Sequence, residues 1–135
     1  MSKKPEQPVL SVNELQTYFK TVDGIAKAVD GVSFSVNAGE TYAIVGESGC
    51  GKSVTALSIL QLVAKPAGYI AGGSIELKGR EISSLPPAEI RKIRGNRISM
   101  IFQEPMTALN PLMRGEHQLS EVFLSHTSMS AEKGH

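Results

Sequence analysis

Three stretches of the chain predict strands, and in the second and third of them apolar and polar positions alternate, which is the pattern of strands that bury one face. The stretches are Val9 to Phe19, AVDGVSFSV at 28–36 and SIELKGREI at 74–82. Asp23-Gly24 stands between the first two and is typical of a hairpin turn, and Gly79 indicates a second turn within the third. The pattern therefore predicts an antiparallel β portion near the start of the chain.

Two other segments predict strands of a different kind. TYAIV at 41–45 is a short, continuous apolar run, which is typical of a strand buried on both faces. RISMIF at 97–102 predicts a further strand, and we expect both segments in a parallel sheet. An antiparallel portion followed by the start of a parallel sheet, with helices between, predicts an α/β fold.

Three helices are predicted, over 52–64, from Ser83 or Ser84 to about Arg94, and over Gly115 to Ser125. In the first, apolar residues fall on one face at spacings of three and four: Ala56, Leu57, Leu60, Val63 and Ala64. In the second, a serine is expected to cap the helix and the Pro-Pro pair at 86–87 to occupy its first turn.

Composition adds mainly exclusions. The 135 residues suit one domain, and with no Trp, 3 Tyr and 4 Phe its core would rest on Val, Ile and Leu. A net charge of +1 gives no general argument for nucleic acid or an anionic membrane. The single cysteine, Cys50, excludes an internal disulfide and favours a reducing compartment. The apolar-rich stretch 54–64 is too short to cross a bilayer, so a membrane role would require a partner, and residues 1–8 are expected to be flexible.

A glycine-rich loop, GESGCGKS at 46–53, stands between the apolar run and the first predicted helix, as in phosphate-binding P-loops. Glycines let the backbone approach an anion closely, and successive N–H groups together with the start of a helix attract its charge. Lys52 is placed to bridge the outer phosphates, and the Ser53 hydroxyl to ligate Mg²⁺. The predicted nucleotide-binding residues of the loop are Gly46, Glu47, Ser48, Gly49, Cys50, Gly51, Lys52, Ser53 and Val54.

A second stretch, RISMIFQEPMTALNP at 97–111, resembles the Q-loop region of ATP-binding-cassette (ABC) transporters. The whole stretch, with the residues that follow the glutamine, is similar to the same region in the ATP-binding subunits of dipeptide and oligopeptide importers. This group includes nickel importers. AVDGVSFSVNAGETYAIVGESGCGKS at 28–53 resembles the approach to the nucleotide in the same family. The resemblance extends from about Val9 to about Ser130, and implies the fold of an ABC-type P-loop ATPase.

The resemblance also implies roles for individual residues. Gln103 corresponds to the glutamine that ligates Mg²⁺ and the attacking water, and relays the nucleotide state to the membrane subunits. Lys52 and Gln103 are therefore the expected catalytic residues. Phe19 falls where the family places an aromatic ring that stacks on adenine, with Tyr18 as the neighbouring alternative. After Pro111 the sequence departs from the family's usual pattern, and the expected contact with membrane subunits is less defined there.

The implied partners are transmembrane permease subunits and a second ATP-binding subunit, identical or different. The implied location is peripheral, at the cytoplasmic face of the inner membrane, and the implied cofactors are ATP and Mg²⁺. The family's LSGGQ motif, its Walker B strand and its switch histidine do not occur in these 135 residues. We therefore interpret residues 9–135 as the N-terminal part of a nucleotide-binding domain, incomplete by itself, which we expect not to hydrolyse ATP alone.

Two alternatives remain open at this level. A small P-loop phosphotransferase would need a substrate lid, for which only the basic cluster RKIRGNR at 91–97 is available. A non-catalytic fragment that binds nucleotide or other subunits is also compatible with the sequence. The balanced charge and the lack of aromatic residues within the basic cluster argue against nucleic acid. The sequence does not specify the imported solute.

Overall fold

The structure is a computed structural model, and it describes residues 7–47, 49, 51–103 and 111–126. The chain divides into two compact units, Met1–Pro86 and Pro87–His135. The expectation of a flexible end at residues 1–8 falls mostly outside the described residues. None of the described helices is long and apolar enough to cross a membrane.

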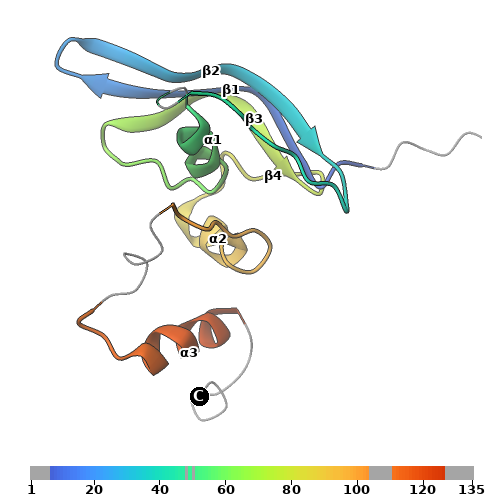
Figure 1. The fold of residues 1–135 in the computed structure, drawn as a ribbon, viewed down its shortest axis with the longest axis vertical. Helices are drawn as coiled ribbons and strands as arrows, with labels where there is room; N and C mark the ends of the chain where they lie inside the picture. The colour runs from blue at the N-terminus through green and yellow to red at the C-terminus, as the bar shows by residue number, and fades with distance from the viewer. Residues whose placement is uncertain (1–6, 48, 50, 104–110, 127–135) are drawn as a thin grey trace, which may run out of the picture. The chain divides into compact units, whose positions relative to one another are not determined.

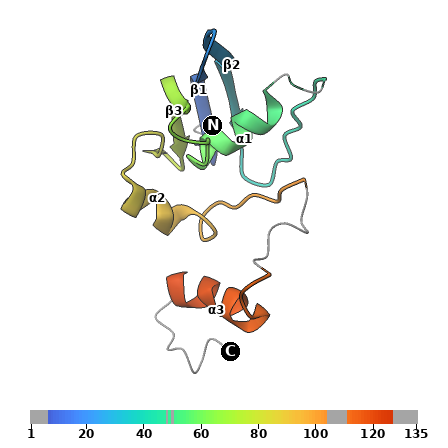
Figure 2. The ribbon, with the colours of Figure 1, turned by 90° about the vertical axis from the view of Figure 1, so that its left-hand side faces the viewer.

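The first unit contains an antiparallel sheet with the strand order β2-β1-β3-β4. Its strands are β1 (Leu10–Thr21), β2 (Gly24–Val36), β3 (Gly68–Leu77) and β4 (Arg80–Glu81). The helix α1 (Lys52–Ile59) lies against one face of this sheet (Figures 1 and 2). The three stretches thus form strands, as predicted, and both turns occur where Asp23-Gly24 and Gly79 indicate them.

The core of the first unit is aliphatic, as the composition predicts. Its buried apolar residues come from the sheet, from α1 and from the segments that follow them: Val12, Leu15, Val29, Ile59, Leu60, Val63, Ile75 and Ile82. Leu15, Ile75 and Ile82 are fully enclosed. Burial of this kind is the main stabilising contribution available to a chain with so few aromatic residues.

The prediction of a buried strand at TYAIV is wrong for this structure. Residues 40–47 contain no strand, and Tyr42, Ile44 and Val45 are exposed, Val45 by 88%. A strand buried on both faces needs a hydrogen-bonded neighbour on each side, because its backbone N–H and C=O groups must find partners. No described strand pairs with this segment, so its apolar side chains remain at the surface.

The second unit contains α2 (Pro87–Ile93) and α3 (Gly115–His126). Ile90 and Ile93 are buried. The predicted strand RISMIF is not formed, because its only described pairing is an isolated parallel bridge between Arg94 and Ile98. Ile101 is 93% exposed. As with the apolar run 41–45, no described strand lies beside this segment to cover it.

Both early helix boundaries differ from the prediction for local reasons. The first helix ends at Ile59 rather than at residue 64, because Gln61 adopts a left-handed backbone conformation (φ 53) and its side-chain amide donates to the carbonyl of Ile82 at 2.7 Å. The second helix begins at Pro87. Its expected serine caps are engaged elsewhere, because the Ser83 and Ser84 hydroxyls both donate to the carboxylate of Glu81.

Candidate nucleotide-binding site

The glycine loop leads directly into α1, and its backbone has the conformation that its glycines suggest. Gly49 and Gly51 have φ values of 83 and 92, in the left-handed region where side chains are strained. Gly51 is the N-cap residue of α1, and no described side chain caps it. The N–H groups of the first turn therefore remain available to an anion, and the helix dipole favours negative charge there.

The end of the loop packs closely against β2. A Cβ atom added to Gly51 would lie 2.5 Å from the carbonyl oxygen of Ala28 and 3.5 Å from a methyl group of Val29. Ala28 lies at a β-bulge, because Thr17 pairs with Val29 while the next residue of β1, Tyr18, pairs with Lys27. The loop thus approaches β2 closely at the bulge, and only glycine fits there.

Lys52 folds back across the loop, and its ammonium group donates to the carbonyl of Gly46. This hydrogen bond joins the first glycine of the loop to the lysine at its end. Behind Lys52, both the backbone N–H and the hydroxyl of Thr55 bond to the carbonyl of Gly51, at 2.9 and 2.8 Å. The arrangement holds a positive charge over a turn of backbone donors, which suits a polyphosphate.

The remaining predicted loop residues vary in accessibility. Glu47 and Ser53 are exposed and Val54 is half-buried, whereas Ser48 and Cys50 lie outside the described residues. An exposed Ser53 hydroxyl at the start of α1 is compatible with a Mg²⁺ ligand. The assignments of Glu47, Ser53 and Val54 to nucleotide and metal stay predictions.

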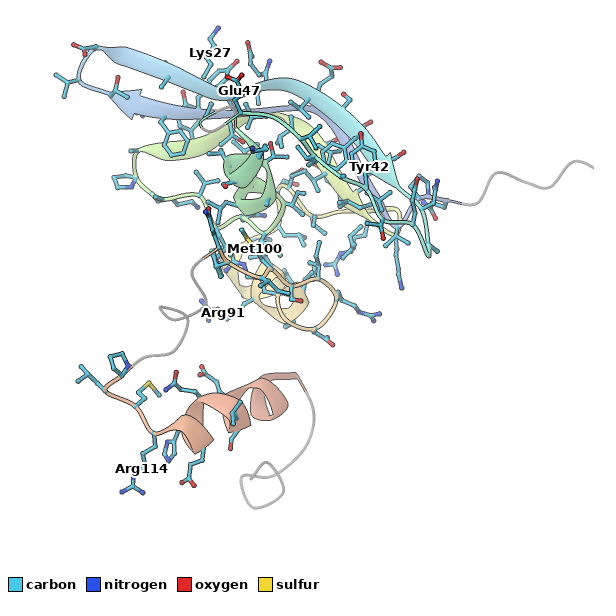
Figure 3. The ribbon with its side chains drawn as sticks, in the orientation of Figure 1. Lys27, Tyr42, Glu47, Arg91, Met100 and Arg114 are labelled. Carbon is cyan, nitrogen blue, oxygen red and sulfur yellow. The ribbon has the colours of Figure 1, made fainter. Side chains whose placement is uncertain are left out.

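A cavity of about 330 Å³ lies beside the loop, and no sequence pattern indicated it. Its walls come from β2, from the segment after β2 and from the start of α1: Val32, Ser33, Phe34, Tyr42, Ala43, Ile44, Val45, Gly51, Lys52 and Thr55. Tyr42, labelled in Figure 3, stacks on Phe34 with ring centres 5.1 Å apart. Residues 42–45 of its lining belong to the apolar run that forms no strand.

The two candidate aromatic residues on β1 point to opposite faces of the sheet, since side chains alternate along a strand. Phe19 shares the face of Thr17, which is buried under α1, and is itself half-buried beside Gly68. Tyr18 points to the other face, where its hydroxyl donates to Asp30 at 2.7 Å and its ring lies near Lys27. Phe19 therefore lies on the face that α1 covers, near the residues that follow α1, and its stacking on adenine stays a prediction.

The hydrogen bond to Asp30 raises the pKa of Tyr18 above its ordinary value, because the phenol must stay protonated to donate and the carboxylate opposes a second negative charge. We expect Asp30→Asn to lower the pKa of Tyr18 toward about 10. Alkaline titration followed by tyrosinate absorbance measures this, with Asp23→Asn in the exposed hairpin turn as the control. Identical titration curves for all three proteins would contradict the assignment.

Gln103 belongs to the second unit, where it is exposed in a bend. Residues 104–110, which follow it in the predicted contact with membrane subunits, lie outside the described residues. Its roles as a Mg²⁺ ligand and as a relay therefore stay predictions.

Comparisons with known proteins agree with these features. The family described as ABC transporter matches residues 29–133, and the chain belongs to this family. It is 48% identical over 125 residues to the oligopeptide transport ATP-binding protein AppD of Bacillus subtilis (strain 168), covering 93% of this chain and 38% of that protein. It is 50% identical over 124 residues to the dipeptide transport ATP-binding protein DppD of the same strain, covering 92% of this chain and 37% of the relative.

The oligopeptide transport ATP-binding protein OppD of Escherichia coli (strain K12) gives a third match, 48% identical over 130 residues. That match covers 96% of this chain and 38% of OppD. The chain thus spans less than two fifths of the length of these three relatives.

Solved structures show the fold. A bacterial ABC transporter cassette, solved as a dimer, matches with a TM-score of 0.76 and 24% identity, over 93% of this chain and 52% of that one. A post-hydrolysis state of the same cassette, bound to ADP and Pi, matches with a TM-score of 0.77 over the same shares. The fold is therefore that of an ABC ATPase cassette, of which the chain represents about half.

Proposed function

We propose that this chain binds ATP with Mg²⁺ as the N-terminal part of the nucleotide-binding domain of an ABC importer for peptides or a related solute. The observation that carries the proposal is the loop itself. It ends at a helix N-terminus without a described side-chain cap, and Lys52 lies across it with its ammonium group on the Gly46 carbonyl. A phosphate oxygen is a stronger acceptor than that carbonyl, so an incoming triphosphate would take over the ammonium group.

In this proposal each part of the loop has a separate task. The backbone N–H groups of residues 46–54 hold the phosphates, and Lys52 neutralises charge on the outer ones. Ser53 supplies a hydroxyl ligand to Mg²⁺, which shields phosphate charge when bound. The exposed part of Phe19 offers a flat apolar surface to the adenine ring, and such stacking contributes about 1–3 kcal/mol per base.

The transport role is proposed for the whole protein. It is supported by the relatives named above, which are ATP-binding proteins of oligopeptide and dipeptide transport. Permease subunits in the membrane and a second ATP-binding subunit are the proposed partners, and a solved cassette of the same fold is dimeric. Gln103 and the segment after it would report the state of the nucleotide to the permease from the cytoplasmic face.

The proposal is tested by titrating the purified chain with ATP, ADP and AMP in the presence of Mg²⁺, following a fluorescent nucleotide and the melting temperature together. ATP and ADP are expected to bind saturably and AMP much more weakly, since the loop recognises the outer phosphates. At a hundredfold excess over Kd, ligand linkage contributes about 2.7 kcal/mol, which raises the melting temperature by several degrees. A cooperatively folded chain that binds none of the three would overturn the proposal.

A further inference from the structure

We propose that the buried hydroxyl pair Thr17–Ser58 positions the phosphate loop relative to the base-binding strand. The Thr17 hydroxyl on β1 and the Ser58 hydroxyl on α1 lie 2.7 Å apart, and both residues have 0% exposure. The core around the pair is mainly aliphatic. Thr55 is also buried there, but its hydroxyl bonds to Gly51 at the start of α1, whereas the Thr17–Ser58 contact joins the sheet to the helix. The role rests on the proposed function, because it concerns the spacing between a base and its phosphates.

The direction of the hydrogen bonds can be assigned. The Ser58 hydroxyl donates to the carbonyl of Val54 at 2.6 Å, which uses its single proton. Thr17 must therefore be the donor in the contact with Ser58. The result is a continuous chain of hydrogen bonds from β1, through Ser58, to the backbone of the first turn of α1. That turn follows Gly51 directly and contains Lys52 and Ser53.

The other contacts of this region show what the pair holds in place. At its start, α1 rests on β2 where Gly51 approaches the bulge at Ala28, and beyond its end Val63 and Phe19 crowd together around Gly68 of β3. The Thr17–Ser58 contact lies between these two supports. Helix α1 therefore crosses the sheet from β2 over β1 toward β3, with its middle fixed by a directional bond.

Phe19 lies on the strand β1, to which the Thr17–Ser58 hydrogen bond fixes helix α1 and the loop before it. Phe19 follows Thr17 by two residues on the same face of β1, a separation of roughly 7 Å along the strand. Apolar contacts would allow α1 to slide over the sheet, whereas a short hydrogen bond between enclosed hydroxyls permits one position. A change in that position would alter the distance from Phe19 to Lys52.

The test compares two probes that need the spacing to different extents. ATP contacts both Phe19 and the loop, whereas inorganic tripolyphosphate contacts the loop alone. The key variant combines Thr17→Val with Ser58→Ala, because replacing both partners with apolar groups of similar shape leaves no buried hydroxyl unsatisfied and keeps the fold. Thr17→Ser retains the donor and serves as the conservative variant. Affinities are measured by calorimetry on the full chain with Mg²⁺, and folding by thermal melting.

The double variant is expected to bind ATP about threefold to tenfold more weakly, the loss expected for one hydrogen bond, while its affinity for tripolyphosphate changes less than twofold. Thr17→Ser should restore the ratio of the wild type. If the double variant melts cooperatively and loses affinity for both probes equally, or for neither, the positioning role is overturned while the proposed function stands. If the folded wild-type chain binds neither probe, both proposals are overturned.

Discussion

Replacing Lys52 with alanine is expected to weaken the binding of ATP with Mg²⁺ by about 10- to 100-fold, the range that corresponds to loss of one hydrogen bond to a charged group. The structure holds the Lys52 ammonium group against the Gly46 carbonyl, and Lys52 is the first residue of α1. No second cation among the described loop residues could replace it. The measurement is the Kd for a fluorescent ATP analogue, with the melting temperature recorded without nucleotide.

Two further variants separate charge from geometry. Lys92→Ala removes the same charge from α2, where Lys92 is exposed and pairs with Glu89 at 3.3 Å, and should leave the Kd unchanged. Lys52→Arg keeps the charge but changes the shape of the donor, and should recover only part of the affinity. An unchanged Kd in Lys52→Ala, or an equal loss in Lys92→Ala, would show that Lys52 does not contact the phosphates.

The antiparallel half of the fold could be predicted because its information is local. Alternation in 28–36 and 74–82, and turn residues such as Asp23 and Gly79, act on neighbouring segments that pair with one another. The apolar runs 41–45 and 97–102 depend instead on distant partners, since a strand in a parallel sheet pairs across a long connection. A run of apolar residues therefore predicts a strand only where such partner strands are present. Among the described residues they are not, and neither run forms a strand.

In the candidate site, too, the local features could be predicted and the contacts between distant residues could not. The loop 46–53 could be predicted because its glycines, lysine and serine carry their meaning in their spacing, and the structure gives Gly49 and Gly51 the left-handed conformations that this spacing implies. The seat of Gly51 on the bulge at Ala28 could not be predicted, because bulges have no clear sequence pattern. Nor could the Thr17–Ser58 pair, because a threonine on a strand and a serine on a helix are each more often exposed than enclosed.

Phe19 and Tyr18 illustrate what the structure adds to a pattern of spacing. Both are aromatic, adjacent and near the end of the first predicted strand. Alternation along β1 places them on opposite faces, but only the position of α1 decides which face is which. Since α1 packs over Thr17, Phe19 lies on the face that α1 covers and Tyr18 on the other, and the role of either ring toward adenine stays a prediction.

Replacing Gly51 with alanine is expected to destabilise the first unit by about 2–5 kcal/mol and to abolish ATP binding. A left-handed conformation contributes about 1–2 kcal/mol of strain for a residue with a side chain. The new Cβ would also lie 2.5 Å from the Ala28 carbonyl oxygen. Relieving such an overlap with the backbone costs a further 1–3 kcal/mol, roughly. Because Gly51 begins α1, any shift that relieves the overlap moves the first turn and Lys52 with it.

Gly49→Ala provides a matched comparison in the same loop. Gly49 has a similar backbone conformation, with φ 83 against 92, but an added Cβ meets no atom within 4 Å. Its substitution should therefore show the conformational strain alone, about 1–2 kcal/mol. Urea denaturation gives both free energies of unfolding, and titration with the fluorescent analogue gives both affinities. If the two variants lose equal stability, the contact with Ala28 has no energetic importance, and the loop is held by its own conformation rather than by the bulge of β2.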